Sequence, residues 1–282
     1  MLTIPAARPP IGRQLALACM LALAVPAAWS APILGAAQSF AVFGGTTVTN
    51  TGASTIDGDV GVAPGTAVTG LASATVSGAV HSNDAAATLA HADALAAASY
   101  LASLAFTRDL SGQDLGGMTL APGIYRLASS AQLTGLLTLD AQNIGAALFV
   151  FQIGSTLTTA GASAVKVING NAGTAVFFGV GTSAVLGAGS LFAGNIVAAG
   201  SVTLDAASQL CGRALATGGA VTLNANGVSN DCGLGADFGS MGFSGGNGLA
   251  QDVPEPATLW LLPLGLLAWR LGSRGKRQPR TA

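Results

Sequence analysis

Side chains that could do acid–base chemistry are scarce in this chain. Only 8% of its 282 residues are charged, and its one glutamate is Glu255. General acid–base catalysis and glycoside cleavage need carboxylates or basic groups gathered in one cleft. The basic residues between positions 31 and 252 are scattered along the chain: Arg108, Arg126, Lys166 and Arg213. We therefore expect that the protein is not an enzyme.

Metal and nucleic-acid binding are also poorly supported. The run 57–59 (Asp-Gly-Asp) lacks the repeated acidic ligands of a calcium site. His81, Asp84 and His91 are too widely spaced along a predicted helix to close a zinc site. Residues 31–252 hold eleven aspartates and four basic residues, a net charge of −7, which disfavours nucleic acid. We expect no metal and no cofactor.

Threonine is the polar side chain with a regular spacing. A tetrad Thr-Leu-Asp/Asn-Ala occurs at 138–141, 203–206 and 222–225, with a looser Thr-Leu-Thr-Thr at 156–159. Because side chains alternate along a strand, leucines pointing inward leave the threonines pointing outward. The expected outward column is Thr138, Thr156, Thr203 and Thr222, with Thr158 as a neighbour on the same face. Val185 interrupts the column.

The elements that would position these threonines follow from a repeat. Ser183 and Ser201 each open an eighteen-residue unit, with glycines at matching offsets, and a third unit begins at 220. Three sides of six residues, with about 4.8 Å between successive coils, describe a β-solenoid. We predict an all-β-dominated fold, a three-sided right-handed-type β-solenoid (β-helix) of about nine coils, filling residues 31–232.

One helix is expected beside the solenoid. From Ser82 the sequence becomes alanine-rich, and Leu89, Ala92, Ala96, Tyr100 and Leu104 recur at helical spacing. Ser82 or Asn83 would be the N-cap, and the helix would cover about 84–106.

The two ends of the chain differ from the middle. Residues 1–30 combine arginines, an apolar run and small residues before Ala31, as in a secretory signal peptide. Residues 233–252 form a Gly-rich linker. Residues 253–282 contain Pro254-Glu255-Pro256, a short apolar transmembrane segment 257–271 and a basic cluster. This tail resembles the PEP-CTERM sorting signal of Gram-negative bacteria.

That resemblance implies a processing route. An exosortase-type enzyme would cut near the Pro-Glu-Pro triplet while the tail is transiently anchored in the inner membrane. The basic end would stay cytoplasmic, which places residues 31–252 outside. In such an exported protein Cys211 and Cys232 could form a disulfide, or they could be two buried thiols; their spacing does not decide between them.

The middle of the chain resembles the ice-binding (antifreeze) proteins with a discontinuous β-solenoid and a long flanking helix. The stretches LGAAQSFAVFGGTTVTNTGASTIDGDVGVAPGTAVTG and LFVFQIGSTLTTA carry the resemblance, which runs from about 34 to 230. It implies a secreted or surface-exposed protein that adsorbs to ice through a flat Thr-rich solenoid face, giving antifreeze activity and inhibition of ice recrystallisation. The alternative is a cell-surface or matrix/adhesion protein, without ice activity, associated with exported polysaccharide.

Some members of that family carry Thr-Ala/Gly-any-Thr/Asn on the ice face. Thr66 and Thr69 fit this pattern, and Thr51 and Ser54 come close to it. We expect these four residues on one face and the Thr156/Thr203 column on another. Asp205, next to Thr203, would weaken the second face because a charged group resists losing its water.

Overall fold

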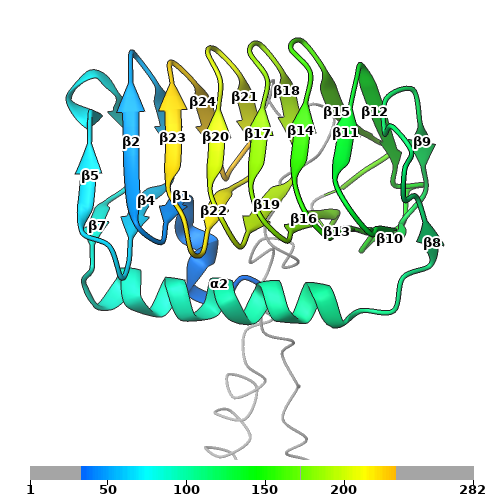
Figure 1. The fold of residues 1–282 in the computed structure, drawn as a ribbon, viewed down its shortest axis with the longest axis horizontal. Helices are drawn as coiled ribbons and strands as arrows, with labels where there is room; N and C mark the ends of the chain where they lie inside the picture. The colour runs from blue at the N-terminus through cyan, green and yellow to red at the C-terminus, as the bar shows by residue number, and fades with distance from the viewer. Residues whose placement is uncertain (1–32, 172, 233–282) are drawn as a thin grey trace, which may run out of the picture. The chain divides into compact units, whose positions relative to one another are not determined.

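The computed structural model describes residues 33–171 and 173–232. Three sheets, in which all strand pairs are parallel, wind into a three-sided β-solenoid with one long helix beside it (Figure 1). The predicted three-sided solenoid with a flanking helix is confirmed. Sheet A has the order β7 (Val80–Ser82), β4 (Asp59–Val62), β1 (Phe40–Gly44), β22 (Ala214–Ala216), β19 (Asn195–Ala198), β16 (Ala175–Val180), β13 (Leu148–Ile153), β10 (Gly123–Leu127) and β8 (Arg108–Asp109).

The other two sheets complete each coil. Sheet B has the order β11 (Ala131–Leu133), β14 (Leu157–Thr159), β17 (Ala184–Leu186), β20 (Val202–Leu204), β23 (Val221–Asn224), β2 (Thr47–Thr51) and β5 (Ala67–Thr69). Sheet C has the order β6 (Thr75–Val76), β3 (Thr55–Asp57), β24 (Gly227–Ser229), β21 (Gln209–Cys211), β18 (Leu191–Ala193), β15 (Ala164–Ile168), β12 (Leu136–Asp140) and β9 (Thr119–Leu120). Two short 3-10 turns, η2 (Gly35–Ser39) and η3 (Leu71–Ser73), lie in the N-terminal coils.

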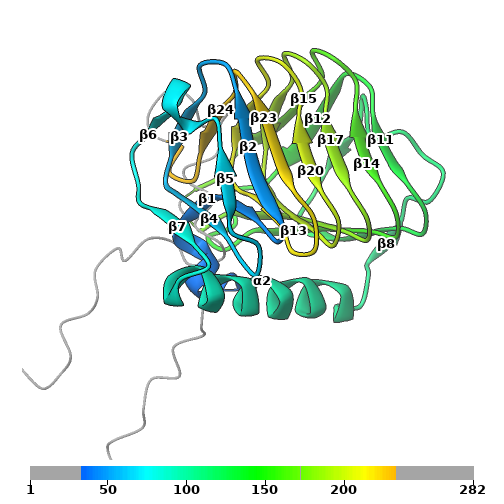
Figure 2. The same ribbon diagram turned by 60° about the vertical axis from the view of Figure 1, so that its left-hand side comes forward.

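The stacking order of the coils is not the chain order. The first coil packs on the last one, so that Val42 of β1 pairs with Ala214 of β22, and Thr49 of β2 pairs with Thr222 of β23. After β7 the chain runs back along the helix and resumes with β8 at the far end of the stack (Figure 2). We call the junction of β1, β2 and β3 with β22, β23 and β24 the seam.

The helix α2 spans Ala85–Ser103 and is shorter than predicted. Its N-cap is Asp84, whose side chain accepts a hydrogen bond from the Ala87 amide; the expectation of Ser82 or Asn83 was wrong. Leu104, already extended, ends the helix. The buried side of α2 is formed by small residues and one leucine, Ala87, Ala90, Ala94, Ala97 and Leu101, which pack in one core cluster with residues of sheet A.

The interior of the solenoid is a second apolar cluster. A row of aromatic rings runs through it from Tyr125 to Phe151, Phe178 and Phe192, with centroids 5.3, 4.5 and 4.7 Å apart; the first three rings are stacked and Phe192 is tilted by 56° against Phe178. At one corner Gly212 has a φ of 139°, and an added Cβ would collide with the Gly194 carbonyl oxygen of the next coil. This close approach explains why glycine recurs at matching offsets in the eighteen-residue repeat.

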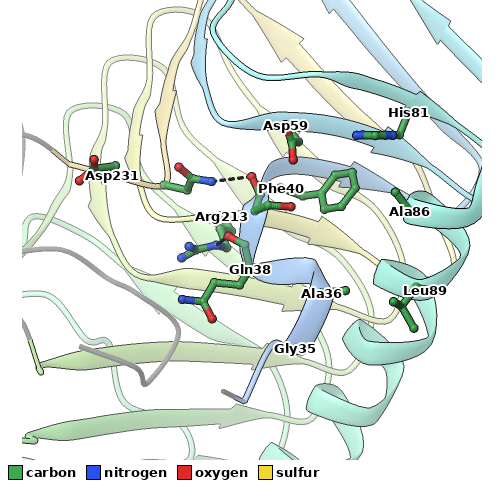
Figure 3. A pocket seen from close by; sticks show the side chains of 12 residues that line it. Gly35, Ala36, Gln38, Phe40, Asp59, His81, Ala86, Leu89, Arg213 and Asp231 are labelled. Atoms are coloured by element: carbon green, nitrogen blue, oxygen red, sulfur yellow. Dashed lines mark hydrogen bonds between the residues drawn. The ribbon is translucent and has the colours of Figure 1, made fainter. Parts of the chain in front are cut away.

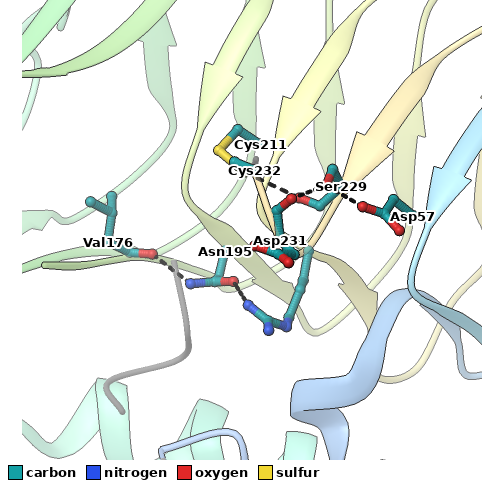
Figure 4. Close-up of a disulfide and its surroundings, with 8 residues drawn as sticks. Asp57, Val176, Asn195, Cys211, Ser229, Asp231 and Cys232 are labelled. Atoms are coloured by element: carbon teal, nitrogen blue, oxygen red, sulfur yellow. Dashed lines mark hydrogen bonds between the residues drawn. A yellow bond between two sulfur atoms is a disulfide. The ribbon is translucent and has the colours of Figure 1, made fainter. Parts of the chain in front are cut away.

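Cys211 and Cys232 form a disulfide with 5.6 Å between their Cα atoms (Figure 4). It ties β21 of sheet C to the last described residue, beside the seam. Of the residues that the structure describes, none belongs to a helix long and apolar enough to cross a membrane. The predicted signal peptide, linker and sorting tail, including Pro254, Glu255 and Pro256, lie outside the described residues.

Candidate functional site

The outer face of sheet B carries a row of threonines. Strand pairing places Thr203 beside Thr222, Thr222 beside Thr49, and Thr49 beside Thr69. These four residues stand on the adjacent strands β20, β23, β2 and β5, which lie side by side at the left and centre of Figure 1. We call them the threonine row. Continued across β17, β14 and β11, the same register reads Val185, Thr158 and Gln132.

The local sequence holds these side chains outward. In β20 and β23 the residues flanking Thr203 and Thr222 are buried in the core: Val202, Leu204, Val221 and Leu223. Thr222 and Thr69 are exposed, and Thr203 and Thr49 are half-buried by their neighbours. The Thr69 hydroxyl donates to the Thr49 hydroxyl at 3.4 Å. Because β-branched side chains have few rotamers, the row has little conformational freedom to lose on contact.

Further polar side chains lie on either side of the threonine row. Thr47 precedes Thr49 on β2, and Thr51, after it, pairs with Asn224. The strands of sheet B contain no charged residue in the described chain, and Asp205, exposed just after β20, is the nearest carboxylate in sequence to the row. Lys166 and Asp140, by contrast, lie on strands of sheet C. The described strands of sheet B therefore form an uncharged surface with short hydroxyl side chains, bordered by Asp205 at the end of β20.

Two predicted members of the Thr column lie elsewhere. Thr138 is on β12 in sheet C, where it pairs with Lys166 and Thr119. Thr156 precedes β14, and it is Thr158 that pairs with Val185 and so falls in register with Thr203. The expected column was wrong here because coils in this part of the chain are longer than eighteen residues: Leu127 pairs with Ile153, 26 residues later.

The expectation of two separate faces was also wrong. Thr69 lies on sheet B with Thr203 and Thr222, and exposed Thr66 directly precedes its strand. Thr51 is exposed at the end of β2 on the same sheet. Ser54 is 2% exposed, and its hydroxyl donates to Asn50 Oδ1, so it cannot contact a surface.

Sequence reasoning missed Thr49, which is central to the row. The run TVTNT at 47–51 alternates threonine with a buried residue, and this pattern could have identified it. Thr49 was overlooked because its partners Thr222 and Thr69 are 173 and 20 residues away and no shared motif links all three.

A cavity lies elsewhere on the molecule and not on this face. It has a volume of about 630 Å³ and lies where η2, β4, β7 and the start of α2 meet (Figure 3). Arg213 lines it; its Nε donates to the Gln38 carbonyl oxygen at 2.8 Å and its Nη1 to Asn195 Oδ1 at 2.9 Å. Burial lowers the pKa of Arg213 to about 10. The first bond crosses the seam and the second joins Arg213 to the preceding coil, so Arg213 has a structural role.

A model of the ice-binding-like family matches residues 42–229, the segment that contains every residue of the threonine row. The chain belongs to the ice-binding-like family. An ice-binding protein of Nostoc sp. (strain HG1) is 52% identical over 204 residues, which cover 72% of this chain and 76% of that protein. The family match agrees with the expectation of a non-enzymatic protein.

Solved structures of ice-binding-like proteins share this architecture. The ice-binding protein from the Antarctic ascomycete Antarctomyces psychrotrophicus is 36% identical, with a TM-score of 0.66 over 71% of this chain and 98% of that chain. An ice-binding protein from an Antarctic biological consortium is 38% identical, with a TM-score of 0.67 over 73% and 95% of the two chains. The resemblance predicted from the sequence is confirmed.

Proposed function

We propose that this protein adsorbs to ice through the outer face of sheet B, with the threonine row at the centre of the contact. The observation that carries the proposal is the register of Thr203, Thr222, Thr49 and Thr69 on four adjacent strands of an uncharged face. Relatives that share the fold and up to 52% of aligned residues are named ice-binding proteins.

The chemistry of the row suits an ice surface. Ice offers no ionic groups, and a threonine brings one hydroxyl and one methyl group without a charge that must be desolvated. Parallel strands about 4.8 Å apart repeat that pair of groups at a constant spacing. Each contact is weak, so affinity comes from many contacts acting together on a surface that is already ordered before binding.

A bulky substitution tests the face. Thr222→Tyr in the middle of the row should hold neighbouring threonines away from the lattice and abolish most of the thermal hysteresis. Thr138→Tyr on sheet C is the matched control, with the same change at a half-buried threonine in a strand. Measurements of hysteresis, crystal shape and recrystallisation rate would contradict the proposal if both variants kept the wild-type activity, or if the unaltered protein had none.

We also infer export and processing of the chain. The sequence of residues 1–30 and 253–282 supports a secreted or cell-surface protein, cut by an exosortase-type enzyme near Pro254-Glu255-Pro256 after transient anchoring in the inner membrane. A disulfide between Cys211 and Cys232 fits an oxidising compartment. Mass spectrometry of the mature protein tests this: intact ends at Met1 and Ala282 would contradict it.

A further inference from the structure

A second feature runs parallel to the threonine row, inside the corner where sheet B turns into sheet C. At this corner five successive coils each place one small polar residue in the interior, and backbone hydrogen bonds join these corners from coil to coil. The column consists of Ser163, Ser190, Ser208, Asn226 and Ser54, each at most 2% exposed. The loops that contain it form the upper edge of the sheet in Figure 1.

Asn226 joins three coils at this corner. Its Nδ2 donates to the Asp205 carbonyl oxygen at 2.7 Å and to Ser208 Oγ at 2.9 Å in the preceding coil. Its Oδ1 accepts from the amide of Asn224 at 2.5 Å within its own coil. Its backbone amide donates to Ser54 Oγ at 3.0 Å across the seam. One side chain and one amide thus connect segments 172 residues apart.

Asn50 extends the same network by one more coil. The Ser54 hydroxyl donates to Asn50 Oδ1 at 2.6 Å, and Asn50 Nδ2 donates to the carbonyl oxygens of Gly52 and Gly70, both at 2.9 Å. A continuous set of hydrogen bonds therefore runs from Ser208 to Gly70. It links the corners that follow β20, β23, β2 and β5, which are the four strands of the threonine row.

The network stops where the threonine row stops. The next corner, after β17, holds Ser190, whose buried hydroxyl has no hydrogen-bond partner among the described residues. β17 is also the strand on which Val185 replaces threonine. The extent of the side-chain network and the extent of the uninterrupted row thus coincide, on a part of sheet B that includes the seam between two distant parts of the chain.

We propose that Asn226, together with Asn50, is a positioning residue that fixes the register and spacing of the threonine row across the seam. Backbone pairing alone allows small shifts between coils that are not joined by a short connection. A buried amide that bonds three coils at once restricts such shifts, because any displacement leaves a buried polar group unpaired. This proposal rests on the proposed function of sheet B.

Asn226→Ser in the full-length protein is the test, since neighbouring coils already have serine at this corner and the variant should fold. Asn230→Ser is the matched control: Asn230 Nδ2 also crosses the seam, donating to the Ser39 carbonyl oxygen at 2.7 Å, but at the corner between sheets C and A. Ser190→Ala is a second control at an equivalent corner. The readouts are thermal hysteresis near the freezing point, melting temperature, and NMR hydrogen exchange of the Asn224 amide.

We expect N226S to lower hysteresis roughly two-fold or more, because many weak contacts depend on a common spacing, while N230S and S190A keep the wild-type value. Exchange at Asn224 should be faster in N226S alone. Equal hysteresis in N226S and N230S would overturn the positioning role, whether both are active or both are weakened. If N226S does not fold, Asn50→Ser is compared with N230S in the same way. An inactive wild-type protein would refute the proposed function instead.

Discussion

Restoring threonine at Val185 should strengthen the ice contact. Val185 pairs with Thr158 on one side and Thr203 on the other, so Val185→Thr joins two parts of one register. The uninterrupted row would grow from four strands to six. With about 4.8 Å between strands, its length would rise from roughly 14 Å to roughly 24 Å, a factor of about 1.7.

The expected effect follows from that length. Contacts that act together on a rigid surface strengthen adsorption at least in proportion to their number, which rises from four to six, so hysteresis should rise by about 1.5-fold or more. Threonine and valine have the same branched shape, and Val185 is half-buried on the outer side of β17, so the free energy of unfolding should change by about 0.5 kcal/mol or less. Calorimetry would check that the variant remains as stable as the wild type.

Two matched variants separate the hydroxyl from other causes. Val185→Ala shortens the same side chain without adding a hydroxyl, and Ala164→Thr adds a hydroxyl on sheet C, where Ala164 pairs with Leu191. Hysteresis should rise in V185T alone, measured at equal protein concentration. If V185T melts like the wild type but is no more active than V185A, the reasoning from an extended row is refuted.

Three further predictions concern stability. Reducing the Cys211–Cys232 disulfide, which spans 21 residues, should lower the free energy of unfolding by about 3 kcal/mol in the chain-entropy model. The melting temperature should then fall by roughly 6–12 °C, measured by calorimetry with and without reductant. An unchanged transition would contradict this prediction. Phe178→Ala, between the rings of Phe151 and Phe192, should cost about 3–5 kcal/mol in urea unfolding, and a loss below 1 kcal/mol would argue against a tight row of aromatic rings. A hydrogen bond from the Ala87 amide, followed by one with His81, holds the pKa of Asp84 below 3.8. The ionised Asp84 therefore stabilises the fold above pH 3.8, and this contribution is lost as the pH falls through the lower pKa of the folded state. Asp84→Asn should flatten the fall in melting temperature between about pH 5 and 3. A curve of melting temperature against pH that runs parallel to that of the wild type would show that Asp84 does not contribute.

The repeat predicted the solenoid but not the register of all its coils. From Val180 onward the coils are nearly regular, since Val180 pairs with Ala198 and Ala198 with Ala216, each eighteen residues apart, and Thr203 pairs with Thr222, nineteen residues apart. Thr203 and Thr222 were placed correctly in that region. Earlier coils are longer, so an offset counted in units of eighteen residues falls on a different side of the coil. Thr138 faces outward between buried Leu137 and Leu139, as expected, but it lies on sheet C.

The seam could not be derived from local patterns. No periodicity in the sequence predicts that β2 pairs with β23, because this pairing joins the first coil to the last. Thr49 and Thr69 were therefore separated from Thr203 and Thr222, although the four residues form one row. The family resemblance named a discontinuous solenoid, but no stacking order of the coils was derived from it.

The helix shows a different limit of prediction from the sequence. Its large residues recur at helical spacing, yet Leu89 is 57% exposed and Tyr100 is 48% exposed, while a different set of alanines, at 87, 90, 94 and 97, faces the protein. α2 packs closely on sheet A, whose outward Phe177 and Val150 fill the interface. Only small side chains fit between them, so the ordinary rule that the largest apolar residues mark the buried side fails here.

The seam also determines where another group can be attached to the domain. Ile33 packs with the apolar cluster between α2 and sheet A, and Cys232 is bonded to Cys211 of sheet C, so both ends of the described chain lie against sheets other than sheet B. A fluorophore, an affinity tag or a second domain joined at either point would lie away from sheet B. The whole length of the threonine row would then remain free to contact a flat surface.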